Sequence, residues 1–126
     1  MDQTRPLIAV LDDEPKFCTA LARLLKSHDF EVVTFTRGEE FLEACASRQP
    51  DCLLLDLHMP DLNGFEILER IAERRVPVLV ITGHDQPGNV LRVRALGALN
   101  YFLKPLNETQ LLAAFRDALT HSETHN

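Results

Sequence analysis

Five short apolar segments, each followed by a stretch with helical periodicity, run through the whole chain. They are rich in Val, Ile and Leu and occupy Leu7–Leu11, Glu31–Phe35, Cys52–Leu57, Val76–Thr82 and Leu99–Leu103. Strands that alternate with helices in one short chain form a parallel sheet, because right-handed crossovers place the helices on both faces. The sequence therefore predicts an α/β fold built from five β-α units, (βα)5.

The polarity of these segments predicts their order in the sheet. The first, third and fourth segments are apolar almost throughout, as expected of strands buried on both faces. The second segment contains Glu31 and Thr34 and the fifth contains Asn100, which suits strands at the two edges. The pattern predicts a doubly wound, flavodoxin-like parallel sheet with strand order 2-1-3-4-5.

Length and charge narrow the class of protein further. The chain has 126 residues, so we expect a single domain over residues 1–126 with its core between about residues 6 and 120. A formal net charge of −6 argues against direct binding of nucleic acid, which needs a basic surface. No apolar run reaches the ~20 residues that span a bilayer, and the start of the chain lacks the apolar stretch of a signal peptide. Three cysteines without paired spacing are expected as reduced core residues. We therefore expect a cytoplasmic protein.

Residues that favour helix starts follow three of the segments. Pro15 is favourable in the first turn of a helix, where its missing N–H needs no partner. Thr36 with Glu39 three residues later has the spacing of a capping box. Asn107 with Gln110 can cap the last helix in a similar way.

Charged and hydroxyl residues stand at the ends of four predicted strands. The first strand is followed by Asp12–Glu14, the third and fourth end in Asp56 and Thr82, and the fifth is followed by Lys104. Each has an ordinary explanation taken alone, such as a helix cap, a strand end or a surface charge. An uncompensated carboxylate at the end of a buried strand is costly, however, which makes Asp56 the hardest to explain structurally. The predicted strand order brings all four ends into one acidic cleft, where doubly wound sheets bind ligands.

The chemistry of this cleft suits phosphoryl groups. Clustered carboxylates repel one another unless a proton or a cation lies between them. Oxygen ligands without His or Cys favour Mg²⁺, especially where carboxylates meet a phosphoryl group. A nearby hydroxyl and ammonium can hold phosphoryl oxygens, and a carboxylate can itself act as the nucleophile.

From about Leu7 to Leu119 the chain resembles the receiver (CheY-like) domain of two-component response regulators. Four motifs carry the resemblance, in order and each at the end of a predicted strand: Val10–Glu14, Leu55–Gly64, Val80–Gly83 and Tyr101–Pro105. The resemblance implies a phosphorylatable signalling switch rather than a turnover enzyme. Such a domain takes a phosphoryl group from a sensor histidine kinase and later loses it by autodephosphorylation.

The resemblance also implies a role for each residue of the acidic cleft. Asp56 would be the phosphoacceptor. Asp13 and Asp56 would bind Mg²⁺ directly together with the backbone carbonyl of His58, and Asp12 would act largely through metal-bound water. Lys104 would pair with the phosphoryl oxygens.

The same resemblance implies how the signal spreads. Thr82 would move to bond the phosphoryl group, and Tyr101 would be the switch aromatic next to a Lys104–Pro105 bond that is commonly cis in this family. The output surface would comprise the helix that ends near Gly97, the strand Leu99–Leu103 and the helix after Asn107. Its exposed residues are expected to contact a downstream effector or a second, phosphorylated copy of the chain, and they include Arg92, Arg94, Asn100 and Arg116. Transcription regulation is one possible output.

Two histidines follow the site residues at equal spacing. His58 lies two residues after Asp56, and His84 lies two residues after Thr82. We expect both as solvent-facing loop side chains that flank the approach of water to the phosphoryl group. They are not expected as metal ligands, because two isolated histidines lack a supporting set of ligands.

Three alternatives remain beside this interpretation. A hydrolase of the haloacid-dehalogenase kind needs Asp-x-Asp after the first strand, whereas Asp12 and Asp13 are adjacent here. A flavodoxin-like flavin binder needs backbone donors in that loop, where three carboxylates would repel a phosphate. A receiver that is never phosphorylated is hard to reconcile with Asp56, Thr82 and Lys104 all being in place. The sequence contains no output domain, so the chain is either a stand-alone receiver or the first part of a longer regulator.

Overall fold

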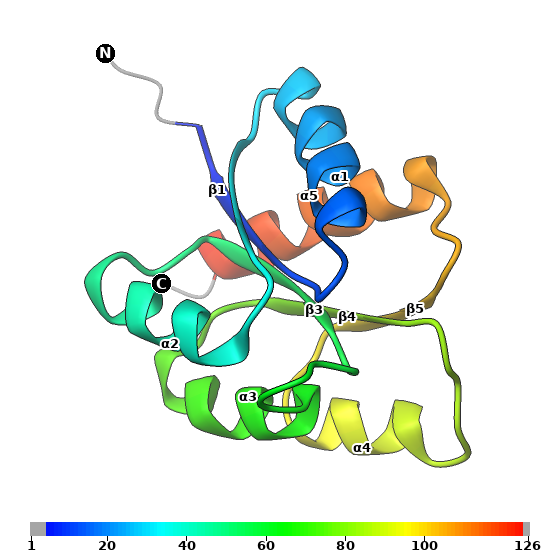
Figure 1. Cartoon of the computed structure of the whole chain (residues 1–126). Coiled ribbons are helices and arrows are strands. Elements are labelled where there is room, and N and C mark those ends of the chain that lie inside the picture. Colours follow the sequence, from blue (N-terminus) through cyan, green and yellow to red (C-terminus); the bar gives the residue numbers. More distant parts are fainter. Residues whose placement is uncertain (1–4, 125–126) are drawn as a thin grey trace.

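The computed structural model describes residues 5–124, and the side chains of residues 5–120. Strands and helices alternate from end to end (Figure 1). The strands are β1 (Leu7–Leu11), β2 (Glu31–Phe35), β3 (Cys52–Asp56), β4 (Val78–Thr82) and β5 (Asn100–Leu103). The helices are α1 (Pro15–Ser27), α2 (Gly38–Ser47), α3 (Gly64–Ile71) with a 3₁₀ turn at Ala72–Arg74, α4 (Asn89–Ala95) and α5 (Glu108–Thr124).

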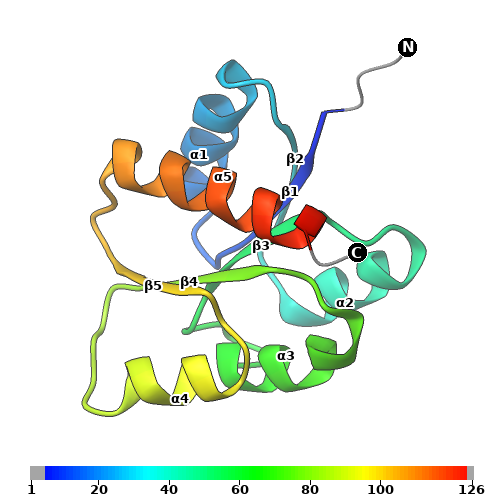
Figure 2. The same ribbon diagram turned by 180° about the vertical axis from the view of Figure 1, so that it is seen from behind.

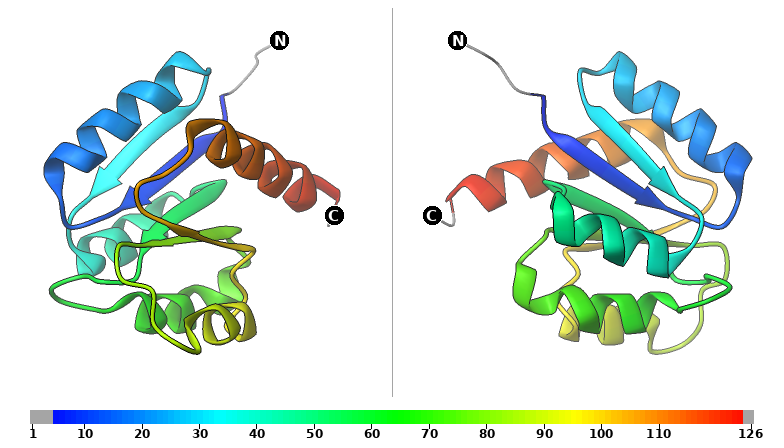
Figure 3. Two further views of the ribbon diagram at one scale, coloured as in Figure 1. Left: turned by 90° about the vertical axis from the view of Figure 1, so that its right-hand side faces the viewer. Right: turned by 60° about the vertical axis from the view of Figure 1, so that its left-hand side comes forward.

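The five strands form one parallel sheet in the order β2-β1-β3-β4-β5. Helices α1 and α5 cover one face, and α2, α3 and α4 cover the other (Figures 1, 2 and 3). Every residue of β1, β3 and β4 is buried, whereas β2 and β5 are partly exposed. The predicted fold class and strand order are therefore confirmed. Among residues 5–124, no helix has both the length and the apolar character needed to cross a membrane.

Alternate residues of the central strands pack into two separate hydrophobic cores, one on each face of the sheet. In β1, Ile8 and Val10 pack toward α1 and α5, whereas Ala9 and Leu11 pack toward α2 and α3. This alternation is the two-residue period of a strand. Because the strands are parallel, their carboxyl ends lie together at one edge of the sheet.

Two of the three predicted helix starts are confirmed. Pro15 is the first residue of α1, and the N–H of Gln110 donates to Asn107 Oδ1 over 2.9 Å at the start of α5. The capping box predicted for Thr36 and Glu39 is wrong: α2 begins at Gly38 without a side-chain cap from its own segment. A capping box does occur at the start of α3, where none was predicted.

The cap of α2 comes from the loop after β3. Asp61 Oδ1 accepts from the N–H of Gly38 over 2.9 Å, and Asp61 Oδ2 accepts from the N–H of Glu39 over 3.0 Å. The loop itself is closed by Gly64, whose N–H donates to the carbonyl of Leu57 over 2.9 Å. A Cβ at Gly64 would lie 2.8 Å from the Cα of Leu57, so only glycine fits there. The loop that follows Asp56 is thus anchored at both ends.

Replacing Asp61 with alanine is expected to lower the free energy of unfolding by about 1–2 kcal/mol at neutral pH, because two N–H groups lose their acceptor. Burial alone would raise the pKa of Asp61, but the N–H groups of Glu39 and Gly38 outweigh it and lower the pKa from 3.8 to about 2. A depressed folded-state pKa stabilises the protein fully above about pH 4, and that stabilisation is lost as the pH falls through about 2.

Urea unfolding across this pH range measures the effect, with the exposed Asp117→Ala as the matched control. The loss in free energy of unfolding caused by Asp61→Ala should shrink toward the loss caused by the control substitution as the pH falls to about 2. If Asp61→Ala loses no more stability than the control at neutral pH, the cap does not stabilise the protein as described.

Candidate functional site

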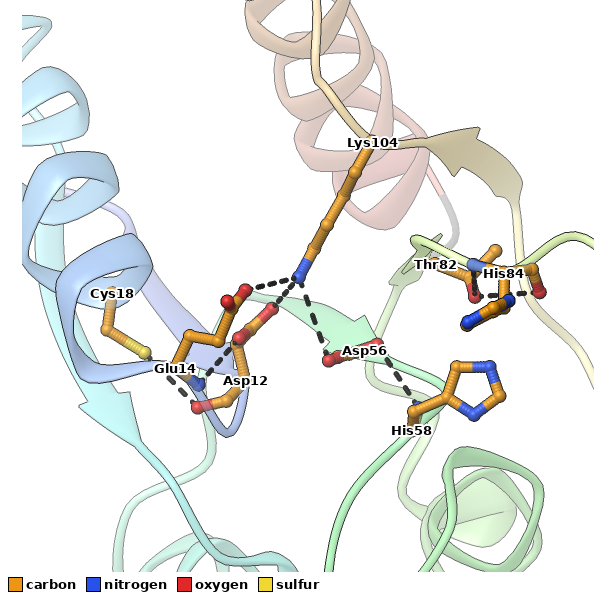
Figure 4. Close-up of polar contacts among 8 residues, drawn as sticks. All are labelled: Asp12, Glu14, Cys18, Asp56, His58, Thr82, His84 and Lys104. Atoms are coloured by element: carbon orange, nitrogen blue, oxygen red, sulfur yellow. Dashed lines mark hydrogen bonds and ion pairs between the residues drawn. The ribbon is translucent and has the colours of Figure 1, made fainter.

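The carboxyl ends of four strands converge on one site (Figure 4). Asp12 follows β1, Asp56 ends β3, Thr82 ends β4 and Lys104 follows β5. Lys104 Nζ lies 2.7 Å from Asp12 Oδ2 and 3.8 Å from Asp56 Oδ2. The structure thus brings together residues that are up to 92 positions apart in the sequence, as the predicted strand order requires.

Lys104 is held by two carboxylates on the β1 side of the site. Besides the contact to Asp12, Nζ donates to Glu14 Oε1 over 3.3 Å. Asp12 is fully buried, and its other oxygen accepts from the N–H of Glu14 over 2.9 Å. Burial acts to lower the pKa of Lys104, but the hydrogen bond and charge of Asp12 outweigh it and raise that pKa. The contact to Glu14 was not expected from the sequence, where Glu14 only extends the acidic turn.

Asp56 is a buried carboxylate with different surroundings at its two oxygens. Oδ1 accepts from the N–H of His58 over 3.1 Å, and Oδ2 faces Lys104. Burial raises the pKa of Asp56 to about 6; the charges of Asp12 and Asp13 add to this, and the N–H of His58 and Lys104 oppose it. A cation beside Asp56 would favour its ionised form and so lower this pKa.

Three carboxylates form a group that could hold a metal ion. One oxygen from each of Asp12, Asp13 and Asp56 lies within 4.8 Å of the other two. Asp13 is exposed, so the group opens to solvent, whereas the other two are buried. An all-oxygen donor set of this kind fits a hard divalent cation such as Mg²⁺.

Thr82 is buried and engaged with the loop that follows it. Its hydroxyl donates to the carbonyl of His84 over 3.1 Å and accepts from the N–H of His84 over 3.0 Å. Tyr101 contacts the same loop: its hydroxyl donates to Asp85 Oδ1 over 2.7 Å and accepts from Asn89 Nδ2 over 3.2 Å. Both residues proposed to switch are therefore tied to the β4–α4 segment in this state.

The imidazole rings of His58 and His84 meet at the side of Asp56 that faces away from Lys104 (Figure 4). Their centroids are 5.7 Å apart and the rings are perpendicular. Both residues are exposed, as expected, but their contact was not, since the sequence shows only two histidines in separate loops. The Lys104–Pro105 peptide bond is cis, as the resemblance implied.

The residues expected at the output surface differ in their surroundings. Arg92, Arg94 and Arg116 are exposed, and Asn100 is half-buried. The guanidinium of Arg92 lies 3.8 Å from the ring centroid of Phe65, so it packs on α3. Three large apolar residues on this surface are exposed although none was predicted to be, namely Val90 at 38%, Leu91 at 76% and Leu103 at 50%.

The Response regulator receiver domain model matches residues 8–116. The chain is 34% identical over 122 residues to the response regulator protein TmoT of Ectopseudomonas mendocina. This alignment covers 94% of this chain and 55% of TmoT. It is 33% identical over 119 residues to the DNA-binding transcriptional regulator NtrC of Escherichia coli (strain K12), covering 93% of this chain and 25% of NtrC. The chain therefore spans between a quarter and about half of these two relatives.

Solved structures agree with the family match. A CheY-like response regulator receiver domain protein from Methanospirillum hungatei JF-1 superposes with a TM-score of 0.92 at 24% identity, over 98% of this chain and 100% of that one. The BeF3-activated N-terminal receiver domain of RstA from Klebsiella pneumoniae does so with a TM-score of 0.82 at 31% identity, over 90% and 97%.

The chain belongs to the response regulator receiver domain family. It is a phosphoacceptor receiver domain and therefore a signalling switch of a two-component system, as the sequence predicts.

Proposed function

We propose that Asp56 is the phosphoacceptor of this receiver domain. One observation carries the proposal: Asp56 is a buried carboxylate at a strand end, with Lys104 Nζ at 3.8 Å and two further carboxylates beside it. One oxygen of Asp56 attacks the phosphorus of a phosphohistidine on a sensor histidine kinase. The P–N bond breaks, its electron pair returns to the imidazole, and that nitrogen takes up a proton. The product is an aspartyl phosphate, an acyl phosphate that water can later hydrolyse.

Lys104 and Thr82 stabilise the transferred group. Phosphoryl transfer makes little covalent demand on the protein, so positioning and charge compensation dominate. Lys104 Nζ is 2.7 Å from Asp12 and only 3.8 Å from Asp56, so a small movement takes it to a phosphoryl oxygen. Thr82 releases the carbonyl of His84 and donates its hydroxyl to another phosphoryl oxygen.

The acidic group fits Mg²⁺ as the cofactor. Asp13 and Asp56 would hold it directly with the backbone carbonyl of His58, and Asp12 would act through water. A bound Mg²⁺ compensates negative charge on the carboxylates and on the phosphoryl oxygens. The chain's own contribution is to hold three carboxylate oxygens within 4.8 Å of one another at the mouth of the site.

The output of the switch is a surface formed by α4, β5 and α5. When Thr82 turns toward the phosphoryl group, Tyr101 leaves Asp85 and turns into the vacated space, a local charge change that biases a two-state element. Exposed Leu91 and Leu103 give this surface apolar area for a downstream effector or a second copy of the chain. Regulation of transcription is one possible output, since the relative NtrC is a DNA-binding transcriptional regulator.

The location and extent of the domain complete the proposal. We infer that the domain acts in the cytoplasm, where the kinase's phosphohistidine would be available. We also infer that the chain is one receiver domain, of which the structure describes residues 5–124, and that this domain does not itself bind nucleic acid or a membrane. The carboxylates in the loop after β1 disfavour a flavin phosphate there, so a flavodoxin-like cofactor is not supported.

Incubation with acetyl phosphate and Mg²⁺ tests this function. We expect a single phosphoryl group on the peptide that contains Asp56, removed by hydroxylamine as acyl phosphates are. Amide NMR shifts should spread from the site to α4, β5 and α5. The Asp56→Asn protein should not be labelled. The Asp29→Asn protein is its matched control, since Asp29 is exposed and has a positive φ that asparagine tolerates. Labelling of another carboxylate, with Asp56 unmodified, would refute the assignment.

A further inference from the structure

The ring contact between His58 and His84 joins the two loops that control the site. His58 follows Asp56 and donates its N–H to that carboxylate, whereas both backbone groups of His84 bond the hydroxyl of Thr82. The rings meet with their centroids 5.7 Å apart. The contact between the two rings therefore links the residue bonded to Asp56, the proposed phosphoacceptor, to the residue bonded to Thr82, the proposed switch residue.

Two isolated histidines in separate loops were not expected to bind a metal, but their contact in the structure places two imidazole donors together. The spacing of the rings suits a shared transition-metal ion. Metal–nitrogen distances of about 2.0–2.1 Å place the centroids of two imidazoles on one tetrahedral ion about 5 Å apart. The observed 5.7 Å differs from that by less than side-chain rotation can supply. Both side chains are exposed, so an ion and its remaining water ligands have access.

The donor chemistry separates this pair from the neighbouring acidic group. Imidazole nitrogen suits Zn²⁺, Ni²⁺ and Cu²⁺, whereas the three carboxylates suit Mg²⁺. The three cysteines are all buried and so do not compete for an ion in the folded protein.

We propose that His58 and His84 form a two-imidazole site for a divalent transition-metal ion of the Zn²⁺ class, which ties the β3–α3 loop to the β4–α4 loop. An ion bound there holds the backbone of His84 against Thr82. The Thr82 hydroxyl then stays away from Asp56, and phosphorylation is inhibited. The binding site stands on the ring geometry alone, whereas the inhibition rests on the proposed function.

Calorimetric titration with Zn²⁺ in saturating Mg²⁺ tests the site. We expect one equivalent to bind at the ring pair, and His58→Ala and His84→Ala each to weaken binding at least about tenfold, or about 1.4 kcal/mol. His28→Ala is the matched control, since His28 is an exposed histidine at the end of α1, and it should bind as the native protein does. Unchanged binding in the double variant of His58 and His84 would overturn the proposal.

The labelling rate with acetyl phosphate tests the inhibition, with each variant compared with its own zinc-free rate. Zn²⁺ should slow labelling of the native protein and of His28→Ala about tenfold, a free-energy change of about 1.4 kcal/mol, and should not slow labelling of His84→Ala. A chelator selective for Zn²⁺ should restore the rate. Slowing that persists in His84→Ala would show that Zn²⁺ displaces Mg²⁺ from the acidic group and would overturn the proposal. A native protein that binds Zn²⁺ but is never labelled, even without zinc, would instead refute the proposed function.

Discussion

Replacing Lys104 with methionine is expected to slow phosphorylation of Asp56 by about 100-fold, the loss typical of removing one charged or hydrogen-bonding group from a developing anion. Lys104 is the only cation within 4.0 Å of the carboxylates of Asp12 and Asp56 among the described residues. Methionine keeps the length and packing of the side chain but removes its charge. The rate of labelling by acetyl phosphate at saturating Mg²⁺ measures the loss.

The same substitution is expected to destabilise the metal-free protein by about 3 kcal/mol, because breaking a buried ion pair leaves an uncompensated charge. The side chain of Lys104 is 18% exposed and that of Asp12 is fully buried, so water replaces little of the lost interaction. Adding Mg²⁺ should recover part of the loss by mass action.

Urea unfolding with and without Mg²⁺ measures this stability, with the exposed Lys16→Met as the control. If Lys104→Met and Lys16→Met lose equal stability without metal, the buried pair does not contribute as described. If Lys104→Met is labelled at the native rate, Lys104 does not contact the transferred phosphoryl group.

Replacing Asp56 with asparagine is expected to stabilise the metal-free protein by about 1–3 kcal/mol at neutral pH while abolishing its labelling. Burial raises the pKa of Asp56 from 3.8 to about 6. A rise of about two units corresponds to about 3 kcal/mol, and solvent screening at the mouth of the site reduces this figure. Asparagine keeps an oxygen that can accept from the N–H of His58 but carries no charge.

The sign of the pH dependence follows from the raised pKa. Between about pH 4 and pH 6 the native state binds more protons at this position than the unfolded state does, so stability falls as the pH rises. The stability lost by ionising the buried Asp56 carboxyl group is close to its full value above about pH 6 and absent below about pH 4. Metal-free Asp56→Asn should therefore exceed the native protein in stability at pH 7 and match it near pH 4.

Urea unfolding of both proteins across this range checks the prediction. Saturating Mg²⁺ should reverse the order at neutral pH, because the native carboxylate can join Asp13 in binding the ion and asparagine cannot replace its charge. A constant stability difference across the whole range would show that Asp56 is ionised in the folded protein at all these pH values.

Much of this site follows from local properties of the sequence. Glu31, Thr34 and Asn100 mark the edge strands, because an edge strand tolerates polar groups that a central strand does not. Once the order of strands is known, Asp12, Asp56, Thr82 and Lys104 must meet, since parallel strands end at the same edge of the sheet. The cap of α5 by Asn107 is equally local, with donor and acceptor three residues apart.

Other features depend on residues that the chain brings together from a distance. Thr36 and Glu39 have the spacing of a capping box, yet Asp61 caps α2 from the loop after β3, because the anchored loop places its carboxylate at the free N–H groups of α2. Nothing in the sequence around α2 indicates that its first N–H groups donate to a carboxylate 22 or 23 residues away.

The sequence by itself determined the order of the strands, the identity of the strand-end residues and the oxygen-only chemistry of the acidic group. These follow from polarity and period, which are properties of each segment. Only the tertiary structure decided that Lys104 contacts Glu14 as well as Asp12, that Thr82 and Tyr101 are tied to the β4–α4 segment, and that the rings of His58 and His84 meet. The reason is physical: the course of a loop and the rotamers of its side chains are set by the elements packed around it, so contacts between two loops are not encoded in either one.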